Sequence, residues 1–163
     1  MKLFAIWSRK VYLCIVFKSR KMYRDKIKEL VLWKLSGNRK PLIILGARQV
    51  GKTWLIQEFG KQEYKQTVYV NFEKMKAVQN LFEEDFDVQR ILTSLSVFAR
   101  SAINPNDTLI VFDEIQAAAG GLTALKYFQE DAPEYHIIAA GSLLGMNLHQ
   151  GVSFPVGKLI LCI

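Results

Sequence analysis

Two kinds of apolar pattern alternate along this sequence. Some apolar runs are short and almost uninterrupted, as in buried strands: residues 42–45, 67–70, 109–112 and 136–140. Between them, apolar residues recur every three or four positions, as on one face of a helix: residues 54–59, 85–100 and 122–130. Strands that alternate with helices in this way favour an α/β fold whose parallel sheet is covered on both faces.

Glycine and asparagine mark the expected ends of the helices. An earlier apolar stripe within residues 27–35 is followed by Gly37 and Asn38, which predict the end of a first helix. The helix that begins near Gly51 is expected to stop at Gly60. In the stripe of residues 85–100, we expect the apolar side chains to face the core: Val88, Ile91, Leu92, Leu95 and Phe98.

The first predicted strand is followed by the G-x-x-x-x-G-K-T spacing of a phosphate-binding loop: Gly46, Ala47, Arg48, Gln49, Val50, Gly51, Lys52 and Thr53. Such a loop and the N-terminus of the next helix direct backbone N–H groups at an anion. We expect Lys52 to reach the β- and γ-phosphates and the Thr53 hydroxyl to bind Mg²⁺. Trp54 follows, and we count it among the residues that contact the nucleotide.

Two carboxylates, Asp113 and Glu114, follow the third apolar run. The carboxyl ends of parallel strands border the crevice in which open α/β sheets bind ligands. Asp113 is therefore a candidate to hold Mg²⁺ through a water, and Glu114 to polarise an attacking water. An apolar strand that ends in Asp-Glu is a weak signal alone, but its position downstream of a phosphate-binding loop strengthens it.

The fourth apolar run ends at Gly141 and Ser142, which we expect at the same edge of the sheet. Ser142 could contact the γ-phosphate or the attacking water, or it could be an ordinary serine in a glycine turn. It lacks the G-x-S-x-G spacing of a hydrolase nucleophile. His136, just inside an apolar strand, is expected to be a packed histidine and not a base.

The positive charge of the chain is concentrated near its start. The sequence has 22 Lys and Arg against 15 Asp and Glu, and the first 24 residues hold seven of the cations and no acid. The remainder is neutral, so the total charge does not indicate a DNA-binding surface. We interpret residues 1–21 as a basic, apolar N-terminal extension and residues 22–163 as one domain. The extension could be poorly ordered, could contact a membrane surface or could bind nucleic acid.

Cysteine and histidine are too few to suggest a disulfide framework or a zinc site. Cys14 and Cys162 lie near opposite ends, and the histidines are His136 and His149. The apolar pieces of residues 1–21 are shorter than the ~20 residues that span a membrane, so we expect no transmembrane segment. A phosphate-binding loop and sparse cysteine together favour a cytoplasmic location.

Four segments together resemble one family: GARQVGKTWL (46–55), VFDEIQ (111–116), LKYFQEDAPEYHIIAAGSLLG (125–145) and SFPVGK (153–158). They are similar to AAA+-type prokaryotic ATPases related to the archaeal ATPase group. Members of that group have an AAA_14-like nucleotide domain and usually a DUF4143 C-terminal region. The resemblance extends from about Met22 to about Lys158, which is most of the chain.

The resemblance implies a role for each candidate residue. Residues 46–53 would be the Walker A loop, and Asp113 and Glu114 would be Walker B, with Glu114 as the catalytic base. Ser142 matches the sensor 1 position. Asn71, at the end of the second strand, corresponds to a polar residue that restrains the glutamate. The fold would be of the additional-strand type, with the third strand inserted between the Walker A and Walker B strands.

Family members continue beyond SFPVGK through a fifth strand, a helical lid and the C-terminal region. This sequence ends at Ile163, so we expect a truncated member without the fifth strand, the lid or an arginine finger. Our first hypothesis is Mg²⁺-dependent ATP hydrolysis. A homo-oligomer or a partner protein is a separate expectation. The alternative is a nucleotide-binding module with little or no turnover. The expected preference for ATP over GTP rests on the resemblance. The sequence also has no Asn-Lys-x-Asp motif, which a GTPase would normally contain.

Overall fold

A computed structural model of the chain describes residues 25–142 and 157–160. These residues belong to two compact units, divided between Ser36 and Gly37. In the first unit, residues 25–35 form a helix, in which Leu30 is fully buried and Leu35 is 73% exposed. The second unit contains the sheet and the candidate site. None of the described helices has the length and apolarity needed to cross a membrane.

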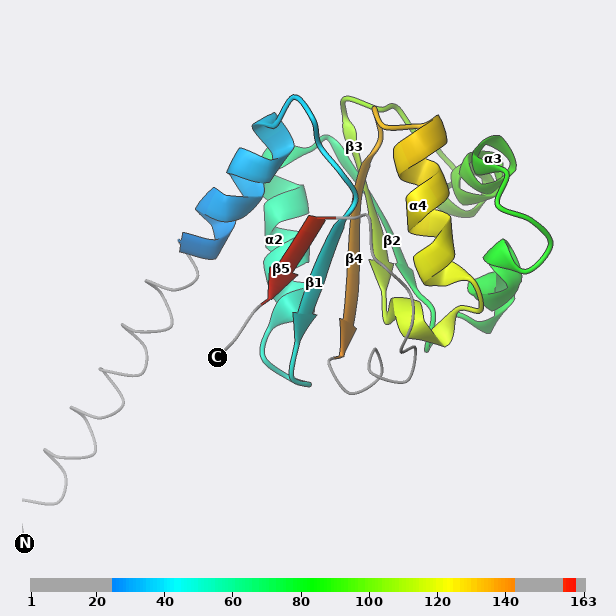
Figure 1. Cartoon of the computed structure of the whole chain (residues 1–163), viewed down its shortest axis with the longest axis horizontal. Coiled ribbons are helices and arrows are strands. Elements are labelled where there is room, and N and C mark those ends of the chain that lie inside the picture. The colour runs from blue at the N-terminus through cyan, green and yellow to red at the C-terminus, as the bar shows by residue number, and fades with distance from the viewer. Residues whose placement is uncertain (1–24, 143–156, 161–163) are drawn as a thin grey trace, which may run out of the picture. The chain divides into compact units, whose positions relative to one another are not determined.

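Within the described residues, the sheet of the second unit has five parallel strands in the order β2-β3-β4-β1-β5 (Figure 1). Their bounds are β1 Leu42–Gly46, β2 Gln66–Asn71, β3 Thr108–Asp113, β4 His136–Ser142 and β5 Gly157–Ile160. Every residue of β1, β3 and β4 is buried, because these inner strands are covered on both faces. The predicted α/β fold with a parallel sheet is confirmed.

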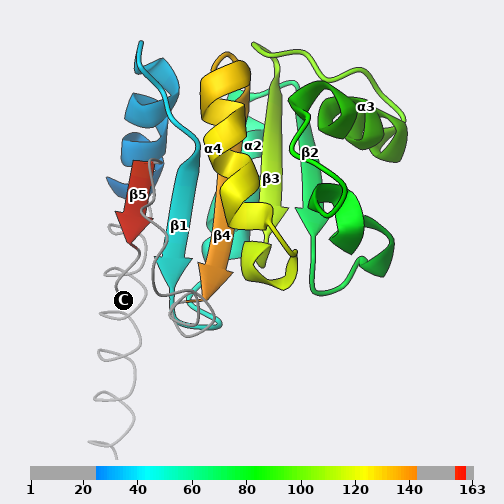
Figure 2. The same ribbon diagram turned by 45° about the vertical axis from the view of Figure 1, so that its right-hand side comes forward.

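Helices form a layer on each side of this sheet. The helix α2 (Lys52–Glu63) lies on one face, and α3 (Val88–Ala99) and α4 (Gly121–Asp131) lie on the other (Figures 1 and 2). Two short 3-10 helices, η1 (Lys76–Phe82) and η2 (Ile115–Ala117), follow β2 and β3. Aromatic rings fill the core under α3 and α4, among them Phe72, Phe82, Phe112 and Phe128.

Two predictions about the strands were wrong. A strand is inserted between β1 and β3, as predicted, but it is β4, the fourth along the chain and not the third, because β3 is itself the strand that ends in Asp113. A fifth strand, which we expected to be absent, is present as β5. It pairs with the outer edge of β1 from Leu42↔Gly157 to Leu45↔Ile160, which satisfies backbone groups that an edge strand would leave unpaired.

We predicted that the helix α2 stops at Gly60, but it continues to Glu63. A Cβ added at Gly60 would lie 2.4 Å from Thr67 Oγ1, a separation that real Cβ atoms essentially never show. Gly60 therefore allows the helix to pack closely against β2. Glycine here serves contact between two elements and not helix termination.

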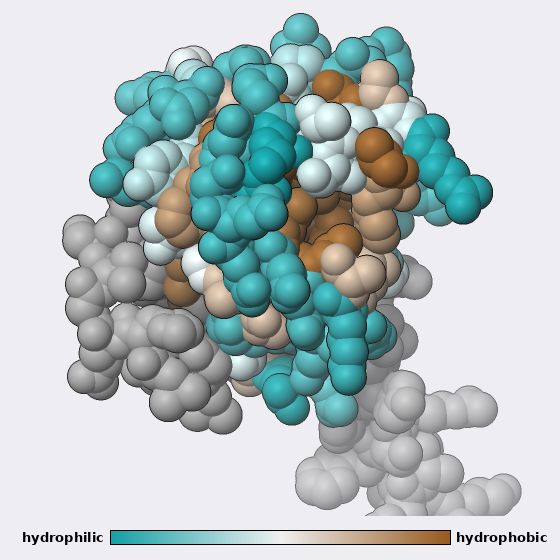
Figure 3. Space-filling model, turned by 90° about the vertical axis from the view of Figure 1, so that its right-hand side faces the viewer, coloured by the Kyte–Doolittle hydropathy of each residue, from teal (hydrophilic) through white to brown (hydrophobic). Residues whose placement is uncertain are grey.

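The helix α3 begins at Val88, three residues later than predicted, because Asp87 is its N-cap. The Asp87 carboxylate accepts the backbone N–H of Gln89 at 2.8 Å and that of Arg90 at 3.1 Å. Four residues of the predicted apolar stripe are buried, but Phe98 is 42% exposed. Phe98 lines a hollow of ≈ 530 Å³ between η1 and α3, and Figure 3 shows apolar side chains on this face.

Candidate functional site

The candidate residues meet at one edge of the sheet because all five strands are parallel. Figure 2 shows the carboxyl ends of β1, β3 and β4 at this edge. Gly46 at the end of β1 is in register with Ser142 at the end of β4. Asn71 at the end of β2 is in register with Asp113 at the end of β3. The edge therefore holds residues from four separate segments of the sequence.

The loop of residues 46–53 (the 46–53 loop) connects β1 to α2 and contains two left-handed residues. Gly51, the N-cap of α2, has φ 88°, and Gln49 has φ 64°. Left-handed residues within a turn bring backbone N–H groups toward a shared concave side, which favours anions. A glycine at position 51 indicated this conformation, whereas Gln49 carried no such signal.

Lys52 lies against the loop from which it projects. The residue is 7% exposed, and Nζ donates to the carbonyl oxygens of Gly46 at 3.1 Å and Ala47 at 2.7 Å. Its positive charge is thus held at the base of the loop, beside the N-terminus of α2. A cation and a helix N-terminus at one place favour a bound anion.

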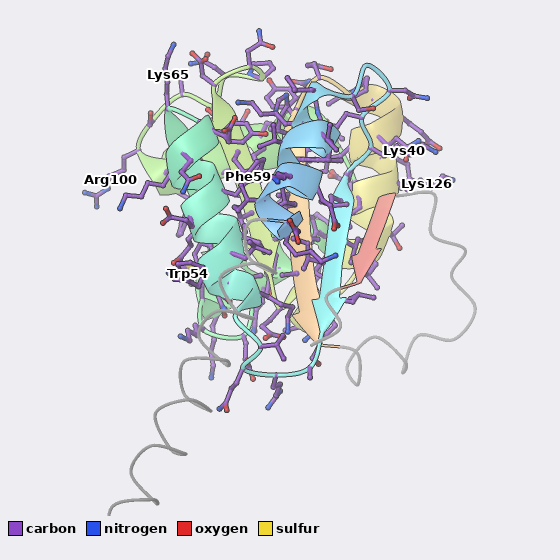
Figure 4. The ribbon with its side chains drawn as sticks, turned by 90° about the vertical axis from the view of Figure 1, so that its left-hand side faces the viewer. Lys40, Trp54, Phe59, Lys65, Arg100 and Lys126 are labelled. Atoms are coloured by element: carbon purple, nitrogen blue, oxygen red, sulfur yellow. The ribbon has the colours of Figure 1, made fainter. Side chains whose placement is uncertain are left out.

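Arg48 and Trp54 are large exposed side chains of this region. Arg48 lies 3.9 Å from the Glu73 carboxylate, with both side chains largely in solvent, so this pair adds little stability. Trp54 is 57% exposed. Figure 4 shows Trp54 near the end of α2 that adjoins the 46–53 loop, and Lys65 beyond its other end.

Asp113 joins the 46–53 loop to the end of β3. Thr53 Oγ1 donates a hydrogen bond of 3.0 Å to Asp113 Oδ2, although the two residues are 60 positions apart. Asp113 Oδ1 accepts the backbone N–H of Glu114 at 3.1 Å, and the Asp113 residue is 3% exposed. A hydroxyl and a carboxylate at this separation fit Mg²⁺, which prefers oxygen ligands and usually retains several waters.

Two side chains of β2 also hold Asp113, and one of them was missed in the sequence. The Tyr69 hydroxyl donates a short hydrogen bond to Asp113 Oδ2, and Asn71 Nδ2 donates to the same oxygen at 3.4 Å. Burial and the bond to Asp113 raise the pKa of Tyr69 to about 12, so its hydroxyl remains a donor at neutral pH. Because alternate strand residues share a face, the two-residue separation from Asn71 could have indicated Tyr69.

Glu114 does not meet Asn71, which was predicted to restrain it. Asn71 is engaged with Asp113, and its Oδ1 accepts the backbone N–H of Lys74 at 2.9 Å. The group that contacts the Glu114 carboxylate is Gln116, whose Nε2 donates to Oε2 at 2.5 Å. Glu114 itself has φ 52°, which is uncommon for a residue with a side chain.

Ser142 and His136 lie at opposite ends of β4. Ser142 is buried at the edge that holds the 46–53 loop, as predicted from its position after an apolar strand. His136 is buried at the other edge, where its Nδ1 lies 2.6 Å from the Tyr64 hydroxyl oxygen. The two rings also pack edge to face. His136 is therefore a packed histidine, remote from the candidate site.

Comparison with known proteins identifies the fold and the family. The family model AAA_14, described as an AAA domain, matches residues 38–162. No curated protein matches the chain. The solved structure of the Aeropyrum pernix ORC1 protein in complex with DNA is similar, with 16% identity over 88% of this chain and 44% of that chain, and a TM-score of 0.54. The structure of C. elegans PCH-2 has 17% identity over 85% and 37%, with a TM-score of 0.39. The chain spans less than half the length of either.

Proposed function

Because the chain belongs to the AAA_14 family of AAA domains, we propose that it binds ATP with Mg²⁺ and hydrolyses it. The observation that carries this proposal is the 3.0 Å hydrogen bond from Thr53 Oγ1 to Asp113 Oδ2. It joins the predicted phosphate-binding loop to the predicted metal-binding carboxylate across 60 positions of sequence. Both groups supply the oxygen ligands that Mg²⁺ prefers.

In this proposal, the 46–53 loop binds the triphosphate through its backbone N–H groups and the N-terminus of α2. Lys52 exchanges its two carbonyl acceptors, Gly46 and Ala47, for phosphate oxygens, which form stronger bonds with an ammonium group. Thr53 and Asp113 hold Mg²⁺, which neutralises charge on the phosphates when bound. Tyr69 keeps the Asp113 carboxylate in place by donating to its Oδ2.

Glu114 is the general base of the proposed reaction. It accepts a proton from a water whose oxygen attacks the γ-phosphorus, and the bond from that phosphorus to the β–γ bridging oxygen breaks. ADP keeps the bridging oxygen, and inorganic phosphate leaves. Ser142 supports the same step as a polar group at the edge, where it can contact the γ-phosphate or the attacking water. Its register opposite Gly46 is consistent with that role.

Other expectations stay predictions. They are the division into residues 1–21 and 22–163, a homo-oligomer or partner protein, nucleic-acid binding by the extension, and a cytoplasmic location. The DUF4143 region, the preference for ATP over GTP and the nucleotide contact of Trp54 also stay predictions. Each of them rests on sequence composition or on family resemblance, and none is needed for the proposed chemistry at the sheet edge.

The proposal is tested by binding and single-turnover hydrolysis of MgATP by the wild type, Glu114→Gln and Glu130→Gln. The last is a matched control, because Glu130 is an exposed carboxylate on α4 that lies 3.8 Å from Lys126. We expect turnover by the wild type and the control, and a loss of about 10²–10⁴-fold in Glu114→Gln, the usual contribution of a general base. Binding without turnover in all three proteins would support the nucleotide-binding module instead. Absence of binding would refute both functions.

A further inference from the structure

Gln116 is the last residue of the VFDEIQ segment, and the proposed chemistry gives it no role. It lies in η2, which turns the chain back immediately after Glu114. The Ala117 N–H donates to the Glu114 carbonyl at 2.9 Å, and the Ala118 N–H donates to the Ile115 carbonyl at 3.1 Å. Ile115 is fully buried and anchors this turn in the core. The turn thereby fixes the backbone that carries Gln116 beside that of Glu114.

The side-chain amide of Gln116 is directed at the Glu114 carboxylate. Nε2 donates to Glu114 Oε2 at 2.5 Å, and a bond from an amide to an ionised acceptor is among the stronger hydrogen bonds. The reversed amide would place two oxygens against each other, so the orientation is determined by this contact. Both residues are half-buried, so water competes only in part for the hydrogen bond between them.

The other end of the same amide has no hydrogen-bond partner among residues 25–142 and 157–160. Gln116 Oε1 is buried and has no hydrogen-bond partner in the part of the chain that the structure describes. A buried carbonyl oxygen without a partner is unfavourable. The amide is kept in this orientation by the bond to Glu114, and not by a network that satisfies the whole side chain. This arrangement indicates that the contact with Glu114 determines the position of the Gln116 side chain.

We propose that Gln116 is a positioning residue for Glu114, an inference that rests on the proposed function. By holding Oε2, Gln116 fixes the rotation of the carboxylate and leaves Oε1 to accept the proton of the attacking water. Asn71 does not supply this restraint, because its amide contacts Asp113 and the Lys74 backbone. The restraint therefore comes from the turn after β3 and not from the end of β2.

The test compares Gln116→Leu with Gln129→Leu, each alone and combined with Glu114→Gln. Gln129 on α4 is a matched control, because its Oε1 is also buried without a hydrogen-bond partner among the described residues, and it forms no hydrogen bond with the residues of the candidate site. Single-turnover hydrolysis and the Kd for MgATP are measured for every variant. The melting temperature of each protein reports whether it folds.

We expect Gln116→Leu to slow single turnover about 10–100-fold, as for a misplaced catalytic group, with the Kd for MgATP unchanged within about twofold. Gln129→Leu should keep the wild-type rate. In the Glu114→Gln background, Gln116→Leu should cause no further loss, because both changes remove the same function. Gln116→Glu, which retains a polar group but places a like charge beside Glu114, should not restore the rate.

A rate for Gln116→Leu within about twofold of wild type would overturn the proposal, as would an equal loss in the presence and absence of Glu114. A parallel loss in Gln129→Leu would also overturn it, since that result indicates a general packing effect. Failure of the proposed function has a different signature. In that case the wild type itself shows no turnover that depends on Glu114, and the inference about Gln116 falls with it.

Discussion

Removal of the Tyr69 hydroxyl tests whether β2 holds the Asp113 carboxylate. Tyr69→Phe deletes one hydrogen bond to a charged group, and such bonds contribute about 1.5–3 kcal/mol. Asp113 keeps its contacts with Thr53 and Asn71, so the buried carboxylate is not left without partners. We therefore expect the lower part of that range, about 1.5–2 kcal/mol of lost unfolding free energy.

The measurement is urea unfolding of the wild type, Tyr69→Phe and Tyr127→Phe at neutral pH. Tyr127 is a matched control, because its ring stacks on Phe86 at 5.0 Å and that contact does not need the hydroxyl. The control should remain within about 0.5 kcal/mol of the wild type. In Tyr69→Phe, the urea midpoint should fall while the slope m stays constant, since the surface exposed on unfolding is unchanged. Equal midpoints for Tyr69→Phe and the wild type would refute the reasoning.

Three other predictions concern packing, capping and pH. Gly60→Ala should lower the free energy of unfolding by about 1–3 kcal/mol, because the added Cβ would meet Thr67 Oγ1. Gly37→Ala is the control, because a Cβ at Gly37 meets nothing within 4 Å. Equal urea midpoints for the two alanine variants would contradict this prediction. Asp87→Ala should lower the free energy of unfolding by about 1 kcal/mol through loss of the α3 N-cap. Asp87→Asn should retain most of the stability that the cap provides, as measured by thermal unfolding. The raised pKa of Tyr69 contributes stability that is complete below the unfolded pKa of about 10 and is lost as pH rises through about 12. As pH rises from 9 to about 12, the free energy of unfolding should therefore fall less in Tyr69→Phe than in the wild type. Identical falls in the two proteins would disprove the linkage.

The inner strands and the 46–53 loop could be predicted from the sequence because their signals are local. A continuous apolar run is what a strand covered on both faces requires, and β1, β3 and β4 each have one. The shared sheet edge then follows from parallel pairing alone. That is why the meeting of Thr53 and Asp113 could be anticipated from two separate segments.

The remaining features depend on contacts that sequence periodicity does not encode. Gly60 looked like a helix end because close packing against Thr67 is visible only once α2 and β2 are placed together. The strand β5 has only four residues and is specified by pairing with β1. The contact of Glu114 with Gln116 depends on a tight turn, and the family resemblance pointed to Asn71 instead.

The central claim is that the 46–53 loop binds a nucleoside triphosphate, and calorimetric titration with MgATP tests it most directly. The comparison is between Lys52→Ala and Lys65→Ala, where Lys65 is an exposed lysine beyond the other end of α2 that pairs with Asp107 at 2.7 Å (Figure 4). We predict binding by the wild type and Lys65→Ala, and affinity lower by about 10–100-fold in Lys52→Ala, the equivalent of one charged hydrogen bond. Equal affinity in the two alanine variants would contradict the account.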